Sequence, residues 1–236
     1  MTLWSDFLTN KGRMIHRWTH YFPIYERHFA PLVNRPITFF EIGLGEGGSL
    51  AMWQRHFGPR ARIVGLDINP DAKAFEDDQI AVRIGNQADR TFLAAVLEEF
   101  GPPDAVVDDG SHIMEHLLAS FDFLYPRLAP AGIYVVEDLH TAYMPGYGGG
   151  LRRPGTFIER CKDLIDELNA DYAGPGLLPT EFTHSTISMH IYDSVVVFER
   201  GHQLKRSMFS PAPGTDKPGR GYEPPQMPPK PGPAKF

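Results

Sequence analysis

The sequence contains one cysteine, Cys161, among its 236 residues. A single thiol excludes an intrachain disulfide and a zinc site built from several cysteines. Long apolar runs are missing as well. Stretches such as residues 194–198 have the length of a strand, far below the roughly 20 residues that span a bilayer. The first residues lack a basic segment followed by an apolar run, so no signal peptide is predicted. We therefore expect a cytoplasmic protein without a membrane span.

Basic residues are also few, because 23 Lys and Arg face 29 Asp and Glu and leave a formal net charge of −6. This balance argues against a protein that wraps nucleic acid with a basic face. Hydrophobic residues make up 42% of the chain and charged residues 22%, which are ordinary globular values and exclude a fully disordered chain. The length corresponds to one large domain or two small ones.

Proline is abundant but unevenly placed. Nine of the 22 prolines fall in residues 211–236, which carry four Lys or Arg, two Asp or Glu and no apolar periodicity. This composition is typical of a disordered or polyproline-like tail, and a ligand for a proline-recognising domain is the sharper alternative. Residues 1–35 look helical and aromatic, and either cap the sheet or complete its core. The predicted organisation is an N-terminal segment, 1–35, a folded domain, 36–210, and the tail, 211–236.

Between these ends, strand-like and helix-like patterns alternate. Short β-branched and aromatic runs predict strands, and apolar residues at helical spacing predict helices. The expected strands are 37–42, 62–66, 80–84, 104–108 and 132–136, and the expected helices are 49–57, 91–100 and 114–128. Such alternation predicts an α/β fold with a parallel sheet and helices on both faces.

The end of the pattern differs from its beginning. The runs 186–191 and 195–198 are separated by three residues only. A parallel return requires a crossover of a dozen or more residues, so these two strands must form an antiparallel hairpin. The sequence therefore predicts a seven-stranded, mostly parallel sheet that finishes with an antiparallel hairpin.

A glycine-rich turn follows the first predicted strand. Gly43, Gly45 and Gly48 match the spacing of the dinucleotide fingerprint, and Asp67 ends the next strand where a ribose-binding acid is expected. This pattern indicates a cofactor that contains a nucleoside. The acids Glu41 and Glu46 beside the turn oppose a pyrophosphate and suit a cationic ligand such as S-adenosylmethionine.

Acidic residues gather at the ends of two later strands. Asp109 and His112 follow strand 104–108, while Glu137 and Asp138 follow strand 132–136. The carboxyl ends of parallel strands meet at one edge of the sheet, so these residues are expected beside the glycine turn. No obvious Lys or Arg accompanies the three carboxylates. A hard cation, Mg²⁺, is therefore predicted there.

Each of these residues also has a purely structural interpretation. Asp108 or Ser111 suits the cap of the following helix. His112 suits a first-turn position without chemistry, and Glu137 with Asp138 suits a solvated loop. Taken together these interpretations are weaker, because four ionisable groups fall at the ends of two strands. His112 then becomes a candidate general base.

These motifs resemble a known family. Glu41-Ile-Gly-Leu-Gly45, Asp67, Val107-Asp-Asp-Gly-Ser-His112 and Val136-Glu-Asp138 are similar to the Rossmann-like class I S-adenosylmethionine-dependent methyltransferases. Within that class they look most like the metal-dependent sugar O-methyltransferases of the mycinamicin and macrocin type. The Asp-Asp-Gly-Ser-His run and the Glu-Asp pair are the specific part, whereas the glycine turn is shared more widely.

The resemblance implies a role for each matching residue. His112 is the implied general base, and Mg²⁺ is held by three implied ligands, Asp109, Glu137 and Asp138. The implied S-adenosylmethionine site is lined by Glu41, Gly43, Gly45, Ser49, Asp67, Gln87 and Asp108. The implied neighbours of the acceptor are Tyr143 and Tyr147. The implied reaction transfers a methyl group to a sugar hydroxyl of a glycoside, oligosaccharide or polysaccharide.

Other functions stay open at this point. They include a relative of the cephalosporin-hydroxylase type and an O-methyltransferase acting on a non-sugar small molecule. A nicotinamide-dependent dehydrogenase would require a set such as Tyr-x-x-x-Lys, and none follows strand 132–136. A non-catalytic adaptor acting through its tail conflicts with the presence of His112 and its acids. The acceptor sugar and the formation of a homo-oligomer are left undecided by the sequence.

Overall fold

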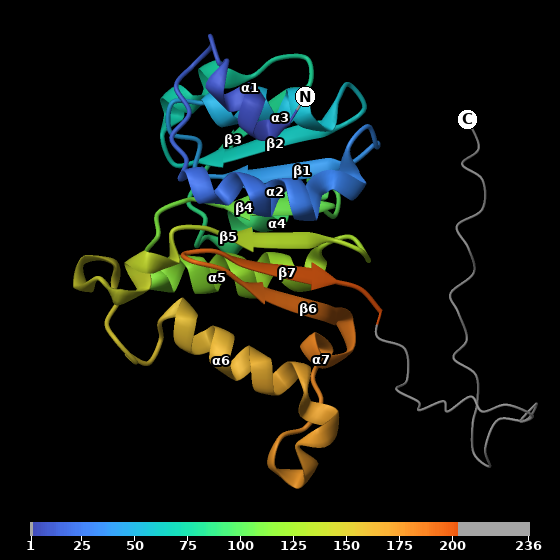
Figure 1. Ribbon diagram of the computed structural model, residues 1–236, viewed down its shortest axis with the longest axis vertical. Coiled ribbons are helices and arrows are strands. Elements are labelled where there is room, and N and C mark those ends of the chain that lie inside the picture. The colour runs from blue at the N-terminus through green and yellow to red at the C-terminus, as the bar shows by residue number, and fades with distance from the viewer. Residues whose placement is uncertain (1, 203–236) are drawn as a thin grey trace, which may run out of the picture.

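A computed structural model describes residues 2–202 of the chain. Within them, seven strands form one sheet in the order β3-β2-β1-β4-β5-β7-β6 (Figure 1). The strands are β1 Thr38–Ile42, β2 Arg62–Asp67, β3 Ile80–Ile84, β4 Ala105–Asp108, β5 Ile133–Val136, β6 Thr186–Ile191 and β7 Val196–Arg200. The first five pair in parallel, and β7 runs antiparallel to both β5 and β6. The predicted sheet and its terminal hairpin are confirmed.

Helices connect the strands and precede the sheet. The α-helices in this part of the chain are α1 Leu3–Leu8, α2 Phe22–Phe29, α3 Gly48–Phe57, α4 Arg90–Phe100, α5 Met114–Leu124, α6 Phe157–Leu168 and α7 Glu181–Ser185. Short 3₁₀ helices are η1 Thr19–Tyr21, η2 Ala30–Leu32, η3 Pro70–Phe75, η4 Tyr125–Arg127, η5 Leu139–Tyr143, η6 Pro145–Tyr147, η7 Ala170–Tyr172 and η8 Gly174–Gly176. Side-chain caps fix several starts, as where Asp89 accepts from two backbone N–H groups of α4.

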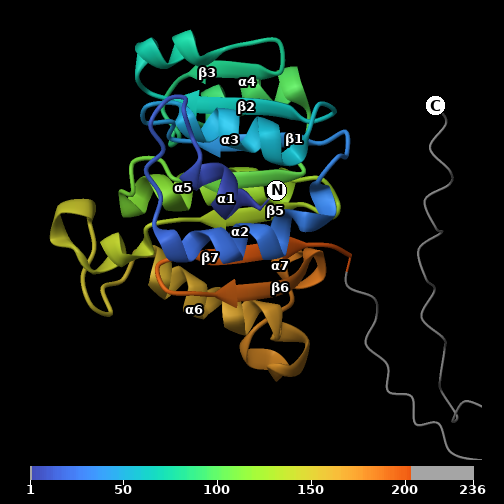
Figure 2. The same cartoon turned by 45° about the horizontal axis from the view of Figure 1, so that its top comes forward.

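Hydrophobic residues fill both faces of the sheet. Successive strand residues point to opposite faces, so Phe39 belongs to one core cluster and Phe40 to the other. The first cluster packs α1, α2 and α3 against the sheet, and the second packs α4, α5 and α6 against the opposite face (Figures 1 and 2). The expectation of helices on both faces is therefore confirmed.

Two helical expectations need correction. The predicted helix 114–128 ends at Leu124, because Pro126 lacks a backbone N–H and a 3₁₀ turn, η4, takes its place. No helix was predicted between 139 and 185, yet α6 and α7 lie there. The buried residues of α6, Phe157, Cys161 and Leu164, have helical spacing, and Thr156 caps its start.

The N-terminal segment serves both of the roles considered for it. Helix α2 buries Phe22, Tyr25 and Phe29 in the first core cluster. Residues 14–18 instead run across the edge of the sheet where β1 and β4 end. The boundary at 210 and the Pro-rich tail, 211–236, lie outside the described residues and stay predictions. No helix between residues 2 and 202 combines the length and apolarity needed to cross a membrane.

Candidate active site

A cavity of about 670 Å³ opens at the carboxyl ends of the parallel strands. This is the edge where the strand order changes direction between β1 and β4, the place where open α/β sheets bind ligands. Its walls come from six parts of the chain, namely residues within 14–21, 42–49, 66–68, 85–87, 109–116 and 137–138, of which the last two include the acidic strand ends.

The turn after β1 forms one wall. Gly43 has φ +82°, and a Cβ atom there would lie 2.2 Å from the carbonyl oxygen of Asp109, so only glycine fits. The backbone N–H of Leu44 donates to Asp67 Oδ2, and that of Asn69 donates to Oδ1, both at 2.8 Å. These bonds fix Asp67 at the cavity while leaving lone pairs free for a ligand. Gly45, another expected cofactor residue, also lines the cavity.

Glu41 lies behind this turn and does not line the cavity, contrary to expectation. Its carboxylate is fully buried and accepts hydrogen bonds from Ser49 Oγ at 2.9 Å and Trp53 Nε1 at 3.0 Å. Burial raises the pKa of Glu41, while Arg17 and these donors act in the opposite direction. Glu41 therefore orients its neighbours, whereas Ser49 itself reaches the cavity wall.

Asp108 is likewise a buried support and does not line the cavity. It accepts from Ser120 Oγ, from Tyr134 Oη at 2.9 Å and from Gln87 Nε2 at 2.9 Å, and burial raises its pKa. Gln87 does line the cavity, and its Oε1 accepts from the backbone N–H of Ser111 at 2.7 Å. Together they hold the turn that follows β4.

Three ionisable side chains face one another at the acidic end of the cavity. His112 Nε2 lies 3.9 Å from Asp109 Oδ1 and 3.7 Å from Asp138 Oδ2. His112 and Asp138 both have left-handed backbone angles, with φ of +57° and +55°. Non-glycine residues rarely adopt this conformation, and such strain concentrates at functional sites. The hydroxyl of Tyr21 donates to Asp138 Oδ1 at 2.6 Å.

Glu137 lies deeper and is completely buried. Tyr25 donates to its Oε1 at 2.5 Å, while Oε2 has no hydrogen-bond partner among residues 2–202. Burial raises the pKa of Glu137 strongly, and the nearby carboxylates of Asp109 and Asp138 add to the rise. A buried carboxylate oxygen without a hydrogen-bond donor is costly, so this atom depends on a nearby cation, and the Arg17 guanidinium lies 3.6 Å away.

Arg17 corrects the expectation that no basic residue accompanies the acids. Its buried guanidinium hydrogen-bonds to Glu41 and Asp109, and its Nε lies 3.6 Å from Glu137 Oε2. Burial acts to lower the pKa of Arg17, but Asp109 and Glu137 outweigh it and raise the pKa well above its usual value. Sequence reasoning missed Arg17, Tyr21 and Tyr25, because no motif or strand register connects the N-terminal segment to the sheet.

The two tyrosines expected beside the acceptor are placed differently from each other. Neither lines the cavity. Tyr147 packs edge-on to His112, with ring centroids 6.3 Å apart. Tyr143, in η5, is 51% exposed. The structure thus brings Tyr147 to the rim of the site and leaves Tyr143 outside it.

Comparison with known proteins identifies relatives of this chain. No protein-family model matches the sequence. It is 40% identical over 212 residues to the 8-demethyl-8-(2-methoxy-alpha-L-rhamnosyl)-tetracenomycin-C 3′-O-methyltransferase of Streptomyces olivaceus, a match covering 82% of this chain and 53% of the relative. It is 38% identical over 212 residues to the demethylmacrocin O-methyltransferase of Streptomyces fradiae. That match covers 84% of this chain and 52% of the relative.

This chain belongs to the family of macrolide and tetracenomycin sugar O-methyltransferases. Among solved structures, the MycE methyltransferase of the mycinamycin pathway in complex with Mg, SAH and mycinamycin VI superposes with a TM-score of 0.73 at 36% identity. That match covers 85% of this chain and 53% of MycE. The chain spans about half the length of the curated relatives it matches.

The acidic end of the cavity has ligand atoms suited to a divalent cation such as the Mg in the MycE complex. Asp109, His112 and Asp138 each offer a ligand atom within 4.8 Å of the others. Glu137 adds the buried oxygen without a hydrogen-bond partner. Carboxylate oxygens are the ligands that Mg²⁺ prefers. In the structure, Arg17 supplies positive charge beside the carboxylates of Asp109 and Glu137.

Proposed function

We propose that this protein is an S-adenosylmethionine- and Mg²⁺-dependent O-methyltransferase that acts on a sugar hydroxyl of a glycoside, oligosaccharide or polysaccharide. One observation carries the proposal: His112 faces Asp109 and Asp138 across the same cavity that holds Asp67 and the glycine turn. Membership of the sugar O-methyltransferase family supports the substrate class. The acidic composition argues against a nucleic-acid partner, and a cytoplasmic location is part of the proposal.

In this proposal the glycine turn and Asp67 hold S-adenosylmethionine. Asp67 accepts hydrogen bonds from the ribose hydroxyls, because both of its oxygens are already oriented by backbone donors. The backbone at Gly43 and Gly45 lets the methionine part approach closely, since neither residue carries a side chain. Gln87 lines the same cavity and offers a polar side chain to the cofactor.

Asp109, Glu137 and Asp138 are the proposed Mg²⁺ ligands. When bound, the ion supplies the positive charge that lowers the pKa of the acceptor hydroxyl. Arg17 contacts two of these carboxylates, Asp109 and Glu137. We infer that Arg17 withdraws from Asp109 when the ion binds, because both cations require the same oxygens.

His112 is the proposed general base. It would take the proton of the acceptor hydroxyl while that oxygen bonds to the methyl carbon and the carbon–sulfur bond of S-adenosylmethionine breaks, which releases S-adenosylhomocysteine. Asp109 and Asp138 lie within 4 Å of Nε2 and stabilise the imidazolium that forms. Base assistance of this kind contributes about 10²–10⁴-fold to the rate. Tyr147, beside the His112 ring, and Tyr143, farther out, are proposed as acceptor neighbours.

Two measurements test the proposal. Calorimetric titration with S-adenosylmethionine is expected to show binding. Incubation with methyl-labelled cofactor and demethylmacrocin, mycinamicin VI or a rhamnosyl tetracenomycin is expected to place label on a sugar oxygen, as identified by mass spectrometry. The absence of cofactor binding would contradict the assignment.

Removal of the metal gives a separate prediction. EDTA is expected to abolish methyl transfer, and added Mg²⁺ is expected to restore it, because the acceptor hydroxyl is a poor nucleophile near neutral pH without a neighbouring cation. The readout is the labelled product before and after Mg²⁺ is returned. Full activity in excess EDTA would remove the metal from the proposal.

A further inference from the structure

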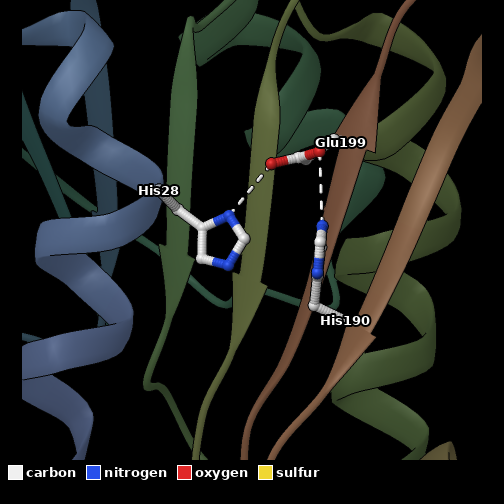
Figure 3. Close-up of side chains that lie close together, drawn as sticks. All are labelled: His28, His190 and Glu199. Carbon is white, nitrogen blue, oxygen red and sulfur yellow. Dashed lines mark hydrogen bonds and ion pairs between the residues drawn. The ribbon is translucent and has the colours of Figure 1, made fainter.

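A second group of metal-binding side chains lies away from the cavity. His28 comes from α2, His190 from β6 and Glu199 from β7, so three elements far apart in sequence meet at one point. Figure 3 shows both imidazole rings beside the carboxylate of Glu199. One ligand atom of each residue lies within 4.8 Å of the others. None of the three lines the active-site cavity.

The distances between neighbouring ligand atoms allow one small ion to reach all three side chains. His28 Nδ1 lies 3.0 Å from Glu199 Oε1, and His190 Nε2 lies 3.3 Å from Glu199 Oε2. A tetrahedral ion with bonds of about 2.0 Å separates its ligand atoms by roughly 3.3 Å. Ser188 Oγ lies 3.1 Å from His190 Nε2, so a further oxygen borders the same point.

The surroundings suit metal ligation by His28. Its Nε2 is 3.0 Å from the hydroxyl of Tyr192. A hydroxyl both donates and accepts, so Tyr192 can pair with either tautomer of the ring. When Nδ1 binds a metal, Nε2 carries the proton and donates it to Tyr192, which is the usual support of a ligating histidine. The change of tautomer therefore leaves no buried group without a partner.

The charge and the accessibility are also appropriate for a cation, because Glu199 supplies a carboxylate beside both imidazole rings. The side chains of His190 and Glu199 are 27% and 35% exposed, so an ion can enter from solvent.

We propose that His28, His190 and Glu199 form a second metal site, which takes a divalent transition metal of the zinc class. Two imidazole nitrogens and one carboxylate favour such an ion over Mg²⁺, which prefers oxygen ligands. The site ties α2 to the C-terminal hairpin. Helix α2 also carries Tyr25, whose hydroxyl donates to Glu137 in the cavity. The second ion therefore stabilises the helix that supports the acidic cluster.

Co²⁺ binding in excess Mg²⁺ tests this proposal, because Mg²⁺ occupies the acidic cluster while Co²⁺ reports nitrogen ligands by its visible absorption. The full chain is first stripped of metal with a chelator. One equivalent of Co²⁺ is expected to bind, and Zn²⁺ is expected to displace it. Wild-type protein that binds no Co²⁺ under these conditions overturns the proposal.

Variants locate the bound ion. His190→Ala and Glu199→Gln are each expected to weaken Co²⁺ binding by about tenfold or more, since each removes a ligand. Glu199→Gln keeps the size of the side chain and guards against loss of fold, which circular dichroism monitors. The matched control His184→Ala removes an exposed histidine of α7 and is expected to bind Co²⁺ as wild type does.

A further comparison separates the two sites. His112→Ala is expected to retain the Mg²⁺-resistant Co²⁺, because His112 belongs to the cavity. Zn²⁺ is also expected to raise the unfolding midpoint of wild-type protein and not that of His190→Ala. Unchanged Co²⁺ affinity in folded His190→Ala and Glu199→Gln, or its loss in His112→Ala alone, overturns the assignment. These outcomes do not depend on methyl transfer.

Discussion

Charge compensation around Arg17 governs the acidic end of the cavity. A guanidinium and three carboxylates share a volume from which water is largely excluded, since Arg17 is 7% exposed and Glu41 and Glu137 are almost completely buried. In such a site each charge depends on its partners, because an unpaired ion cannot recover its lost hydration. Arg17 therefore stabilises the folded apoprotein and at the same time competes with a metal ion for Asp109.

Replacing Arg17 by methionine tests both effects. Arg17→Met is expected to lower the free energy of unfolding of the metal-free protein by about 3–5 kcal/mol, because buried carboxylates lose their cation. Mg²⁺ is expected to restore more stability to the variant than it adds to wild type. Urea denaturation with and without Mg²⁺ measures both quantities.

The matched control for Arg17 is Arg55→Met. Arg55 is 45% exposed and pairs with Asp6 at the surface, so its loss is expected to change the free energy of unfolding by about 0–1 kcal/mol. Equal effects of the two substitutions would contradict the role given to Arg17.

The role of His112 makes a different prediction, which concerns rate and not binding. His112→Ala is expected to lower turnover by about 10²–10⁴-fold, because the acceptor hydroxyl loses its base. The affinity for S-adenosylmethionine is expected to stay nearly unchanged in calorimetry. Normal turnover in this variant would exclude His112 as the base.

Sequence patterns account for part of this site. Asp109, His112 and Asp138 were placed together from the strand ends, because parallel strands deliver their carboxyl ends to one edge. Arg17 escaped prediction because it lies 92 residues from Asp109, in a segment with no register to the sheet. The burial of Glu41 and Asp108 behind the cavity was not predicted either, because side-chain packing decides which acids face the cavity.

At the scale of elements, the close approach of two turns shapes the cavity. The turn after β1 meets the turn after β4, and Gly43 lies where a Cβ atom would strike the backbone of Asp109 and Gly110. Gly45 also has a positive φ, but nothing lies within 4 Å of its virtual Cβ. The two glycines thus separate the effect of a steric clash from that of backbone strain.

Gly43→Ala is expected to be much more damaging than Gly45→Ala. Both substitutions place alanine in a left-handed conformation, at about 1–2 kcal/mol each. Only Gly43→Ala also displaces the Asp109 backbone, which adds about 1–3 kcal/mol and weakens cofactor binding. Urea denaturation and S-adenosylmethionine calorimetry compare the pair. Similar losses of stability and cofactor affinity in both variants would contradict a steric role for Gly43 between the two turns.

Elements with a clear hydrophobic period were predicted closely. Strand β3 and helix α4 lie within one residue of their expected bounds, because burial and periodicity agree there. Helix α6 was missed although Phe157, Cys161 and Leu164 repeat at helical spacing. The sequence signal for this helix was present, because Thr156 caps its start and the apolar spacing is helical, and α6 packs in the second core cluster.

For the whole molecule, the free energy of unfolding depends on the two core clusters that cover the sheet. It also depends on pH, because buried groups such as His56 titrate differently in the folded and unfolded chains. His56 on α3 packs beside Trp53 and Phe57, and its Nε2 is buried with no hydrogen-bond partner among residues 2–202. Burial lowers the pKa of His56 in the folded state. The unfolded chain therefore binds a proton at a higher pH than the folded one.

The predicted consequence is a loss of stability in mild acid. Below the unfolded histidine pKa of about 6.5, protonation favours the unfolded chain, so the contribution of His56 is complete above that pH and declines as the pH falls. His56→Gln does not titrate and is expected to lose less stability between about pH 7.5 and pH 5. Urea denaturation across this range measures the difference. Parallel pH profiles would contradict it.

The long interval between the N-terminal segment and its partners also sets an order of events during synthesis. Tyr25 contacts Glu137 across 112 residues of sequence. At translation rates of about 5–20 residues per second, roughly 6–22 seconds separate the appearance of the two side chains. During that time Tyr25 on α2 and Arg17 cannot contact Glu137, because the residue has not been synthesised. The cavity therefore cannot be completed until Glu137 and Asp138 have emerged, although one of its walls is made first.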